Sequence, residues 1–305
     1  MRVFVTGGSG WIGSALVPEL IRRNHQVLGL ARSSASATAL QANGAEALRG
    51  DIDDLGTLRA GADRCDGVIH LAFKHDIAFS PEGMVAAATA DRQAIDAIGE
   101  TLAGSDRPFV IASGTPAVPG RVATEHDEAP ARGPAAPRGA NAQALIGMAA
   151  RGVRSSVVRL PRSVHGQGEL HGFIPRLIAI AREKGVSGYV GEGLSRWPAV
   201  HVLDAAQLFR LAVENAPAGS VLHGVGDEGV PTREIATVIG RHLDLPTASL
   251  PAEDFGFLGM ILAGDQPASS ALTRELLRWQ PVQPGLIEDL EQGHYFASAP
   301  QGVRS

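Results

Sequence analysis

Continuous apolar runs alternate with stretches of helical spacing along the first half of the chain. The runs predict strands over residues 2–6, 26–30, 45–48, 67–71, 108–112 and 153–159. They are continuous rather than alternating, which is typical of strands covered on both faces. Helices are predicted between them, over residues 12–23, 34–43, 53–61, 82–103 and 138–151. This order predicts βαβ units, and therefore an α/β fold with a doubly wound parallel sheet.

The rhythm loosens after about residue 165. Helices are predicted over residues 173–184, 203–216, 231–243, 252–262, 269–278 and 284–292, with short extended segments at 187–190 and 220–224. We expect a first domain of residues 1–165, whose sheet later segments can complete, and a mainly helical region of residues 166–305. The second region should form a smaller cap on the substrate side, over the strand ends where α/β sheets bind ligands. Residues 114–137, rich in Pro, Gly and charge, predict a long surface loop there.

Glycines fill the turn between the first strand and the first helix, in the segment MRVFVTGGSGWIG. The early glycines permit backbone angles that a Cβ forbids, Gly10 lets the main chain approach a pyrophosphate, and Gly13 lets the helix pack on the strand. The helix N-terminus adds free N–H groups and a partial positive charge. We therefore expect a Rossmann-type cofactor site that includes Thr6, Gly7, Ser9, Gly10, Trp11, Ile12 and Gly13.

The end of the second strand indicates which nicotinamide cofactor is bound. An acidic residue there hydrogen-bonds the ribose hydroxyls of NAD, whereas an arginine accommodates the 2′-phosphate of NADP. The chain has Arg32 and Ser33 at this point and no carboxylate, so we predict NADP(H). The alternative is a solvent-facing arginine. Asp51 and Ile52 follow the third strand and should border the adenine, although Asp51 would equally suit a helix cap.

Composition limits the classes of function. A net charge of -5 without a Lys/Arg run argues against a nucleic-acid surface. The single Cys65 excludes an intrachain disulfide, and there is no apolar run of about 18 residues, so we expect a cytoplasmic protein without membrane contact. Scattered histidines without a cysteine cluster argue against a metal site. Arginine outnumbers the two lysines, which with the richness in Ala, Gly and Pro suggests a bacterial genome.

Several segments resemble the extended short-chain dehydrogenase/reductase family. Its TGxxGxxG signature fits the glycine turn, and later matches are HLAF at 70–73, ASGT at 112–115, RLPRSVHGQG at 159–168 and WPAVHVLDAA at 197–206. The matches span roughly residues 1–245. The resemblance implies cofactor contacts by Leu71, Ala72, Phe73, Pro161 and Val164. It also implies a catalytic serine at Ser113 and a homodimer formed through the helix 82–103.

The family's catalytic pair of tyrosine and lysine, YxxxK, is absent. It should lie some 25 residues past Ser113, where the chain reads PRGANAQ. The chain has only Tyr189 and Tyr295, and neither is followed by lysine four residues later. The chain is therefore identified as an atypical member, of the kind named NAD-dependent epimerase/dehydratase.

Other residues must then assist the reaction. Ser113 would polarise a substrate, or alternatively bond local backbone. Lys74 and His75 follow the fourth strand inside the expected cleft. His75 has the chemistry to donate a proton near neutral pH, with Asp76 setting its tautomer; otherwise Lys74 or His75 binds ribose or pyrophosphate, or faces solvent. Arg138 begins the helix that lacks the tyrosine, where it either binds an anionic substrate group or faces solvent.

We expect the small-molecule substrate to be bound by His165, Tyr189, Trp197 and His201, although His201 also suits a structural role. The sequence predicts an NADPH-dependent oxidoreductase that reduces a small, fairly apolar ketone, enone or imine. One alternative is a non-catalytic NADP(H) sensor that has lost the catalytic pair. Another is a sugar-nucleotide epimerase or dehydratase, which the missing tyrosine makes the weaker hypothesis.

Overall fold

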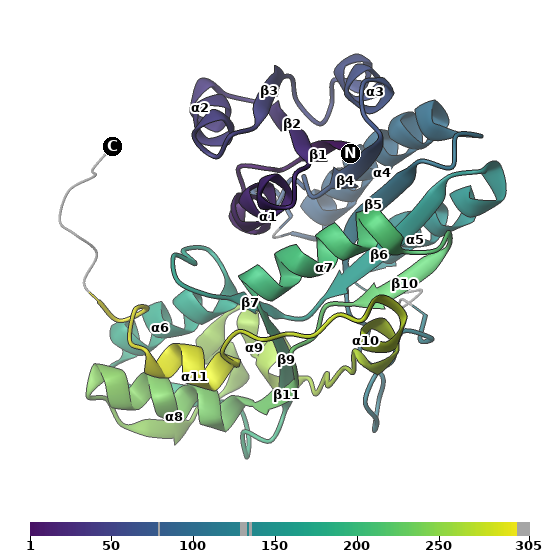
Figure 1. The fold of residues 1–305 in the computed structure, drawn as a ribbon. Coiled ribbons are helices and arrows are strands. Elements are labelled where there is room, and N and C mark those ends of the chain that lie inside the picture. The colour runs from purple at the N-terminus through teal and green to yellow at the C-terminus, as the bar shows by residue number, and fades with distance from the viewer. Residues whose placement is uncertain (79, 129–132, 134–135, 298–305) are drawn as a thin grey trace.

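The computed structural model describes residues 1–78, 80–128, 133 and 136–297. In this part of the chain the main sheet has seven parallel strands, in the order β10-β6-β5-β4-β1-β2-β3 (Figure 1). They are β1 (Arg2–Thr6), β2 (Gln26–Ala31), β3 (Glu46–Arg49), β4 (Gly67–His70), β5 (Pro108–Gly114), β6 (Arg154–Leu160) and β10 (Ser220–His223). The first six agree with the predicted strands to within two residues. The doubly wound Rossmann-type sheet is confirmed.

Helices cover both faces of this sheet. One face carries α1 (Trp11–Arg22), α2 (Ser34–Ala42) and α7 (Val202–Asn215), and the other carries α3 (Leu55–Asp63), α4 (Pro81–Leu102) and α5 (Ala136–Gly147). A 3-10 turn, Met148–Arg151, follows α5. Strand order reverses between β1 and β4, and α/β sheets bind ligands in the crevice outside the carboxyl ends of strands at such a point.

Strand β1 explains why its sequence is apolar without a break. Val3 and Val5 pack in the core formed with α1 and α7, whereas Phe4 packs in the core formed with α3 and α4. Successive side chains of a strand point to opposite faces, and both faces are covered here. All three side chains are fully buried.

The later part of the chain forms a smaller region beside the strand ends. A three-stranded sheet contains β7 (Ser163–His165), β9 (Arg196–His201) and β11 (Asp227–Pro231), and β8 (Ser187–Tyr189) pairs with β12 (Thr247–Ser249). Around them lie α6 (Phe173–Lys184), α8 (Thr232–Leu243), α9 (Leu258–Ala263), α10 (Ala271–Leu277) and α11 (Leu286–Glu291). The predicted helix 252–262 is instead a 3-10 turn (Ala252–Phe255) followed by α9, because Gly256 adopts φ +56 between them.

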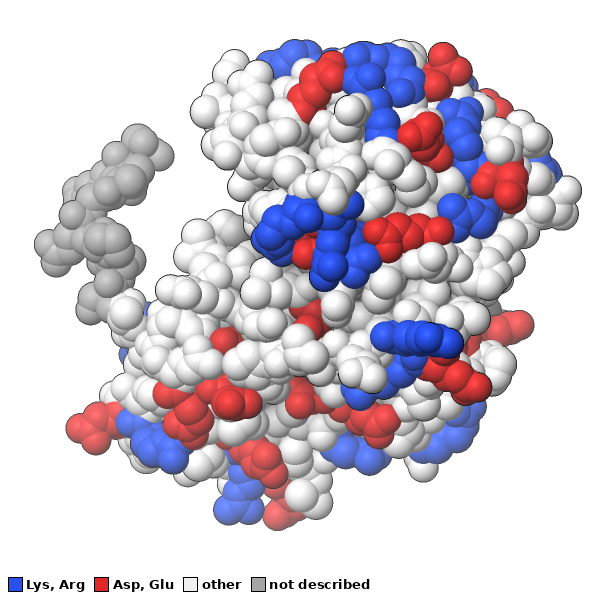
Figure 2. All heavy atoms as spheres, in the orientation of Figure 1, with Lys and Arg blue, Asp and Glu red and all other residues white. Residues whose placement is uncertain are grey.

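Two elements of the later part of the chain pack onto the main sheet. Helix α7 packs against α1, and β10 pairs with β6 to extend the main sheet. Of the predicted loop 114–137, residues 129–132 and 134–135 lie outside the described residues. Figure 2 shows positive and negative side chains interspersed over one face of the molecule. No helix within the described ranges is both long and apolar enough to cross a membrane.

Candidate functional site

The glycine turn after β1 forms an open cradle. Gly7 has φ +69, a left-handed conformation, and a Cβ there would lie 2.7 Å from the Ala72 nitrogen at the end of β4. A Cβ on Gly13 would lie 2.2 Å from the Gly7 carbonyl oxygen, so only glycine lets α1 pack on the turn. A Cβ on Gly10 would meet only the Gly7 oxygen, at 3.3 Å. The space in front of Gly10 is therefore left to a ligand.

The N-terminus of α1 beside this cradle is suited to a phosphate. Its N-cap residue is Gly10, no side chain caps it, and the first turn carries no acidic residue. The unpaired N–H groups and the helix dipole favour an anion there. Ser9 is exposed, and Trp11 and Ile12 are half-buried. The Trp11 indole Nε1 donates to the Val164 carbonyl oxygen at 2.7 Å, which joins the turn to β7.

Basic and hydroxyl side chains gather where β2 and β3 end. Arg32 is exposed directly after β2, and Ser33 caps α2 by accepting from the Ser36 nitrogen at 3.0 Å. Arg49 stands opposite Ala31 in the neighbouring strand and is exposed. Arg49 was not predicted as a site residue, because strand register is needed to see that it neighbours the end of β2.

The next turn contains the two residues expected at the adenine. Asp51 Oδ1 accepts from the Asp53 nitrogen at 3.2 Å, and Asp54 rather than Asp51 caps α3. The capping alternative for Asp51 is therefore wrong. Ile52 is 8% exposed and packs in the core, which favours a structural role. Lys74 Nζ donates to Asp53 Oδ2 at 2.5 Å, so its ammonium lies against this turn.

The glycine cradle, the uncapped helix and the basic strand ends together fit a nicotinamide dinucleotide. The other residues predicted to contact it flank the same edge of the sheet. Leu71, Ala72 and Phe73 continue from β4 and are half-buried, and Pro161 and Val164 lie where β6 passes into β7.

A buried hydrogen-bond chain links the cradle to α5. The Thr6 hydroxyl oxygen accepts from the Ala72 nitrogen at 3.2 Å, and the same hydroxyl hydrogen-bonds His70 Nδ1 at 2.7 Å. His70 Nε2 then donates to Asp91 Oδ1 at 3.2 Å. Asn141 Nδ2 donates to Asp91 Oδ2 at 2.7 Å. These bonds hold the pKa of Asp91 below its usual range although burial opposes this.

Arg138, Phe73 and Ser113 lie near the ends of β4 and β5. Arg138 of α5 lies with its guanidinium carbon 4.2 Å from the centre of the Phe73 ring, and its Nη2 donates to the Ala112 carbonyl oxygen at 3.3 Å. The next residue, Ser113, is 8% exposed. No described residue hydrogen-bonds its Oγ, so the alternative of a backbone-bonded hydroxyl is not what the structure shows. The structure thus brings a free hydroxyl and a cation together.

His75 lies beside this group. Its ring centre is 5.0 Å from that of Phe73. His75 is an exposed residue, as its solvent-facing alternative expected. Desolvation by its neighbours, and then the positive charge of Arg138, lower the pKa of His75 below its usual 6.5. The imidazole is therefore mostly neutral at pH 7, so it is a hydrogen-bonding group more than an acid there.

Two of the predicted substrate residues come together elsewhere. His165 is fully buried, its Nδ1 bonds Asp289 Oδ2 at 2.9 Å, and its ring centre is 5.4 Å from that of His201. Both line a cavity of about 170 Å³ whose lining residues all come from position 165 onward. His201 also caps α7, because its ring nitrogen accepts from the Leu203 nitrogen at 3.2 Å. This agrees with the structural role that the sequence left open for His201.

The other two predicted substrate residues lie apart from them. Trp197 is fully buried in the core of the later region, 5.8 Å from Phe173 between ring centres, which favours a structural role. Tyr189 is half-buried at the end of β8, with Arg233 stacked 5.5 Å from its ring centre.

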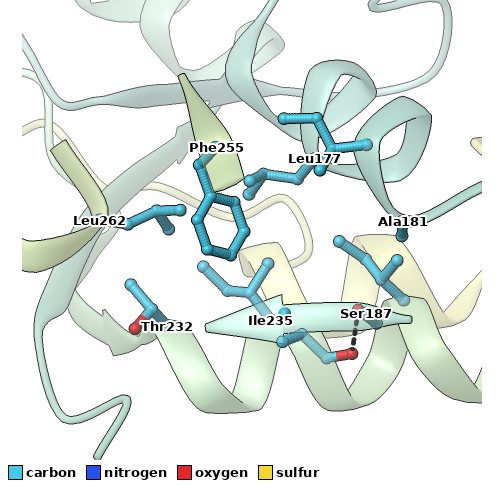
Figure 3. Close-up of a pocket in the computed structure, with 11 residues that line it drawn as sticks. Leu177, Ala181, Ser187, Thr232, Ile235, Phe255 and Leu262 are labelled. Carbon is cyan, nitrogen blue, oxygen red and sulfur yellow. Dashed lines mark hydrogen bonds between the residues drawn. The ribbon is translucent and has the colours of Figure 1, made fainter. Parts of the chain in front are cut away.

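An apolar cavity within the same core is too small for a substrate. It lies between α6, α8 and α9, with Leu177, Ile235, Phe255 and Leu262 around it (Figure 3). Its volume of about 10 Å³ accommodates about one water molecule. Among the described residues, no group of three or more His, Cys, Asp or Glu side chains is arranged to hold a metal ion.

Comparisons with known proteins agree with this geometry. An uncharacterized protein of Schizosaccharomyces pombe is 45% identical over 302 residues, covering 97% of this chain and 100% of its own length. This relative is fungal, so it does not support the bacterial origin inferred from composition. The 4-hydroxy-2-methyl-3-oxo-4-farnesyl-3,4-dihydroquinoline-1-oxide ketoreductase of Stigmatella aurantiaca is 29% identical and covers 83% of this chain and 75% of its own.

A solved structure and a family model complete the comparison. The UDP-glucose 4-epimerase of Thermotoga maritima, solved with UDP-glucose, superimposes with a TM-score of 0.78 at 21% identity, covering 97% of this chain and 98% of its own. This likeness shows the shared fold. The model of the NAD dependent epimerase/dehydratase family matches residues 3–223. The chain therefore belongs to the NAD dependent epimerase/dehydratase family, as an extended short-chain dehydrogenase/reductase.

Proposed function

We propose that this protein is an NADPH-dependent reductase of a small, fairly apolar carbonyl, enone or imine that works without a Tyr/Lys pair. The observation that carries the proposal is the unbonded hydroxyl of Ser113 beside the Arg138 guanidinium, at the same sheet edge as the dinucleotide cradle. A protein that only bound the cofactor would not need a free donor at this point.

The family supports redox chemistry in general. Its members are nicotinamide-dinucleotide dependent, with oxidoreductase- or epimerase-type activity. A ketoreductase among the relatives supports reduction for this chain too. Sugar-nucleotide epimerisation is less favoured, because the tyrosine on which it depends is missing.

The choice of NADP(H) over NAD(H) rests on the end of β2. Arg32 and Arg49 are exposed on adjacent strands, and no carboxylate follows β2. Two guanidinium groups favour a 2′-phosphate, which NADP has and NAD lacks. The Ser33 hydroxyl at the start of α2 adds a polar group beside them.

The residues at the ends of β4 and β5 supply the remaining chemistry. A bound nicotinamide supplies a hydride to the electrophilic carbon. Ser113 donates a hydrogen bond to the substrate oxygen or nitrogen, and the Arg138 charge makes this end of the site favourable for developing negative charge. The Phe73 ring holds the guanidinium by stacking. The proton comes from water or from His75.

Cofactor binding is tested first. Calorimetry should show tighter binding of NADPH than of NADH, and Arg32→Ala should remove most of this preference. Arg92→Ala is the matched control, because Arg92 is an exposed arginine paired with Asp96 on α4. Equal affinities for both cofactors in the wild-type protein would overturn the NADP(H) assignment.

Turnover is tested next, by NADPH oxidation at 340 nm against ketones, enones and imines. Turnover that falls at least tenfold in Ser113→Ala, with NADPH affinity retained, supports the reductase. Tight NADPH binding without turnover across the panel would instead favour the sensor. Conversion of nucleotide sugars without net NADPH oxidation would favour an epimerase.

A further inference from the structure

Arg138 is a partly buried cation without an ionic partner. A guanidinium has five N–H donors, and the only hydrogen bond of Arg138 within the described residues is the one from Nη2 to Ala112. Its guanidinium also stacks over the face of the Phe73 ring in a cation–π contact. No carboxylate of the described chain lies within ion-pair distance of it.

The nearest acidic influence does not neutralise Arg138. Asp91 acts on it through space, but both Asp91 oxygens are already bonded, one to His70 and one to Asn141. A cation that is desolvated without a paired anion is unfavourable, and such groups are normally paired. The remaining donors of Arg138 are therefore available to an anionic ligand.

The position of Arg138 limits what that ligand is. Its Nη2 lies 3.3 Å from the carbonyl oxygen of the residue preceding Ser113, so both side chains flank one strand end. A planar fork of donors matches a carboxylate. A substrate that meets both side chains has its carboxylate and its ketone only a few bonds apart.

We propose that Arg138 binds the carboxylate of the substrate, and that the substrate is a short 2-oxo or 3-oxo acid. This rests on the proposed reductase function, and it replaces a fairly apolar carbonyl compound with a small ketone that bears an acid group. The ketone gains a hydride at carbon and a proton at oxygen and becomes a hydroxy acid, while NADPH is oxidised to NADP⁺. The carboxylate is unchanged.

The test uses pairs of an acid and its methyl ester, which differ in the negative charge and in one methyl group. They are pyruvate against methyl pyruvate, and acetoacetate against methyl acetoacetate. For at least one of the two pairs, we expect the wild-type kcat/KM of the acid to be about 10- to 100-fold higher than that of its ester. This is the difference expected from a charge-assisted hydrogen bond to the carboxylate. Arg138→Met should abolish this ratio, and Arg138→Lys should keep part of it, since lysine retains the charge but not the fork. Arg92→Met should leave the ratio unchanged.

A binding measurement separates this proposal from the reductase function. Calorimetric titration of the NADP⁺-saturated protein with 3-hydroxybutyrate and with its methyl ester needs no turnover. Acid-selective binding that Arg138→Met removes supports the carboxylate site even if no substrate is reduced. Esters reduced or bound as well as the acids would overturn it and leave the reductase proposal standing. Circular dichroism and melting curves confirm that the variants are folded.

Discussion

Tyr295 and Glu169 share a short hydrogen bond in which the tyrosine hydroxyl donates to Glu169 Oε2 at 2.5 Å. The same hydroxyl accepts from the Gly166 nitrogen at 3.0 Å, which ties the segment after α11 to the loop that follows β7. Burial raises the pKa of Glu169 to about 7. A sequence search for a tyrosine–lysine pair passes over Tyr295, although its hydroxyl is a central contact of this loop.

The raised pKa of Glu169 predicts a pH-dependent stability. In the folded protein the carboxyl keeps its proton up to about pH 7, whereas in the unfolded chain it loses it near 4.5. Between these pH values the folded state binds more protons than the unfolded chain. The contribution of the Glu169 carboxyl group to the free energy of unfolding is therefore complete below pH 4.5 and is lost as the pH rises toward 7. The change is about 3 kcal/mol at most.

Urea unfolding at pH 5 and pH 8 checks this. Glu169→Gln removes the titration, so its free energy of unfolding relative to wild type should be higher at pH 8 than at pH 5. Glu183→Gln, an exposed position on α6, controls for the lost charge. The same pH dependence in wild type and Glu169→Gln would contradict the prediction.

Two glycines of the cradle should respond differently to alanine. Gly13→Ala drives a methyl group to 2.2 Å from the Gly7 carbonyl oxygen, so the free energy of unfolding should fall by about 1–3 kcal/mol. In Gly10→Ala the added methyl group lies 3.3 Å from a single atom, so the protein should still fold. The methyl group then occupies the space expected for the cofactor phosphate. We expect NADPH binding to weaken at least about tenfold in Gly10→Ala. Urea titration and calorimetry measure the two effects, and equal stability of both variants would refute this account.

How far the fold follows from sequence is clear from α6 and β9. Helix α6 begins and ends at the predicted residues, because Gly172 precedes it and Gly185, with φ +67, terminates it. Strand β9 was not predicted, since Pro198 stands in its middle and proline weakens any strand pattern. Its extended form depends on pairing with β7 and β11, which only the tertiary structure provides.

The same limit applies to the site. Ser113 was singled out because its segment resembles the family's serine segment, and Arg138 because it lies near the position of the missing tyrosine. Lys74 was expected in the cleft, but its partner could not be predicted, because the direction of a loop is not encoded in local pattern. In the structure its ammonium donates to Asp53, in the turn expected to border the adenine. Arg138 also lacks an ion-pair partner because both oxygens of Asp91 are bonded to other residues. These partners come from β4 and α5, so they could not be predicted from the sequence.

The bond chain through Thr6 predicts a stability effect without loss of volume. Thr6→Val leaves His70 Nδ1 and the Ala72 N–H unpaired in a buried site, so unfolding should become easier by about 2 kcal/mol. Thr101→Val is the control, because that hydroxyl bonds only the Ala97 carbonyl of its own helix. Urea unfolding of both variants decides it, and equal losses would argue against a special role for Thr6.

If His75 supplies the proton, the pH profile of reduction reports it. Only the protonated imidazole donates, and its pKa lies below 6.5, so kcat/KM should rise as pH falls through the range below 6.5 and then level off. His75→Gln should remove this limb and lower kcat/KM at pH 6 by about 10²-fold or more. An unchanged profile in His75→Gln would assign the proton to water.

Trp11 should report cofactor binding directly by fluorescence. The chain has three tryptophans, and Trp197 and Trp279 are fully buried, whereas Trp11 lies half-buried on the glycine turn. NADPH bound at the cradle should quench Trp11 emission, and Trp11→Phe should abolish the quenching. The lost bond to the Val164 oxygen should also weaken NADPH binding by about two- to tenfold, as expected for one neutral hydrogen bond. Trp279→Phe should keep the quenching, because its indole bonds the Asp204 carbonyl away from the cradle. Quenching that persists in Trp11→Phe would mean that the nucleotide binds elsewhere, and the cradle assignment would fall with it.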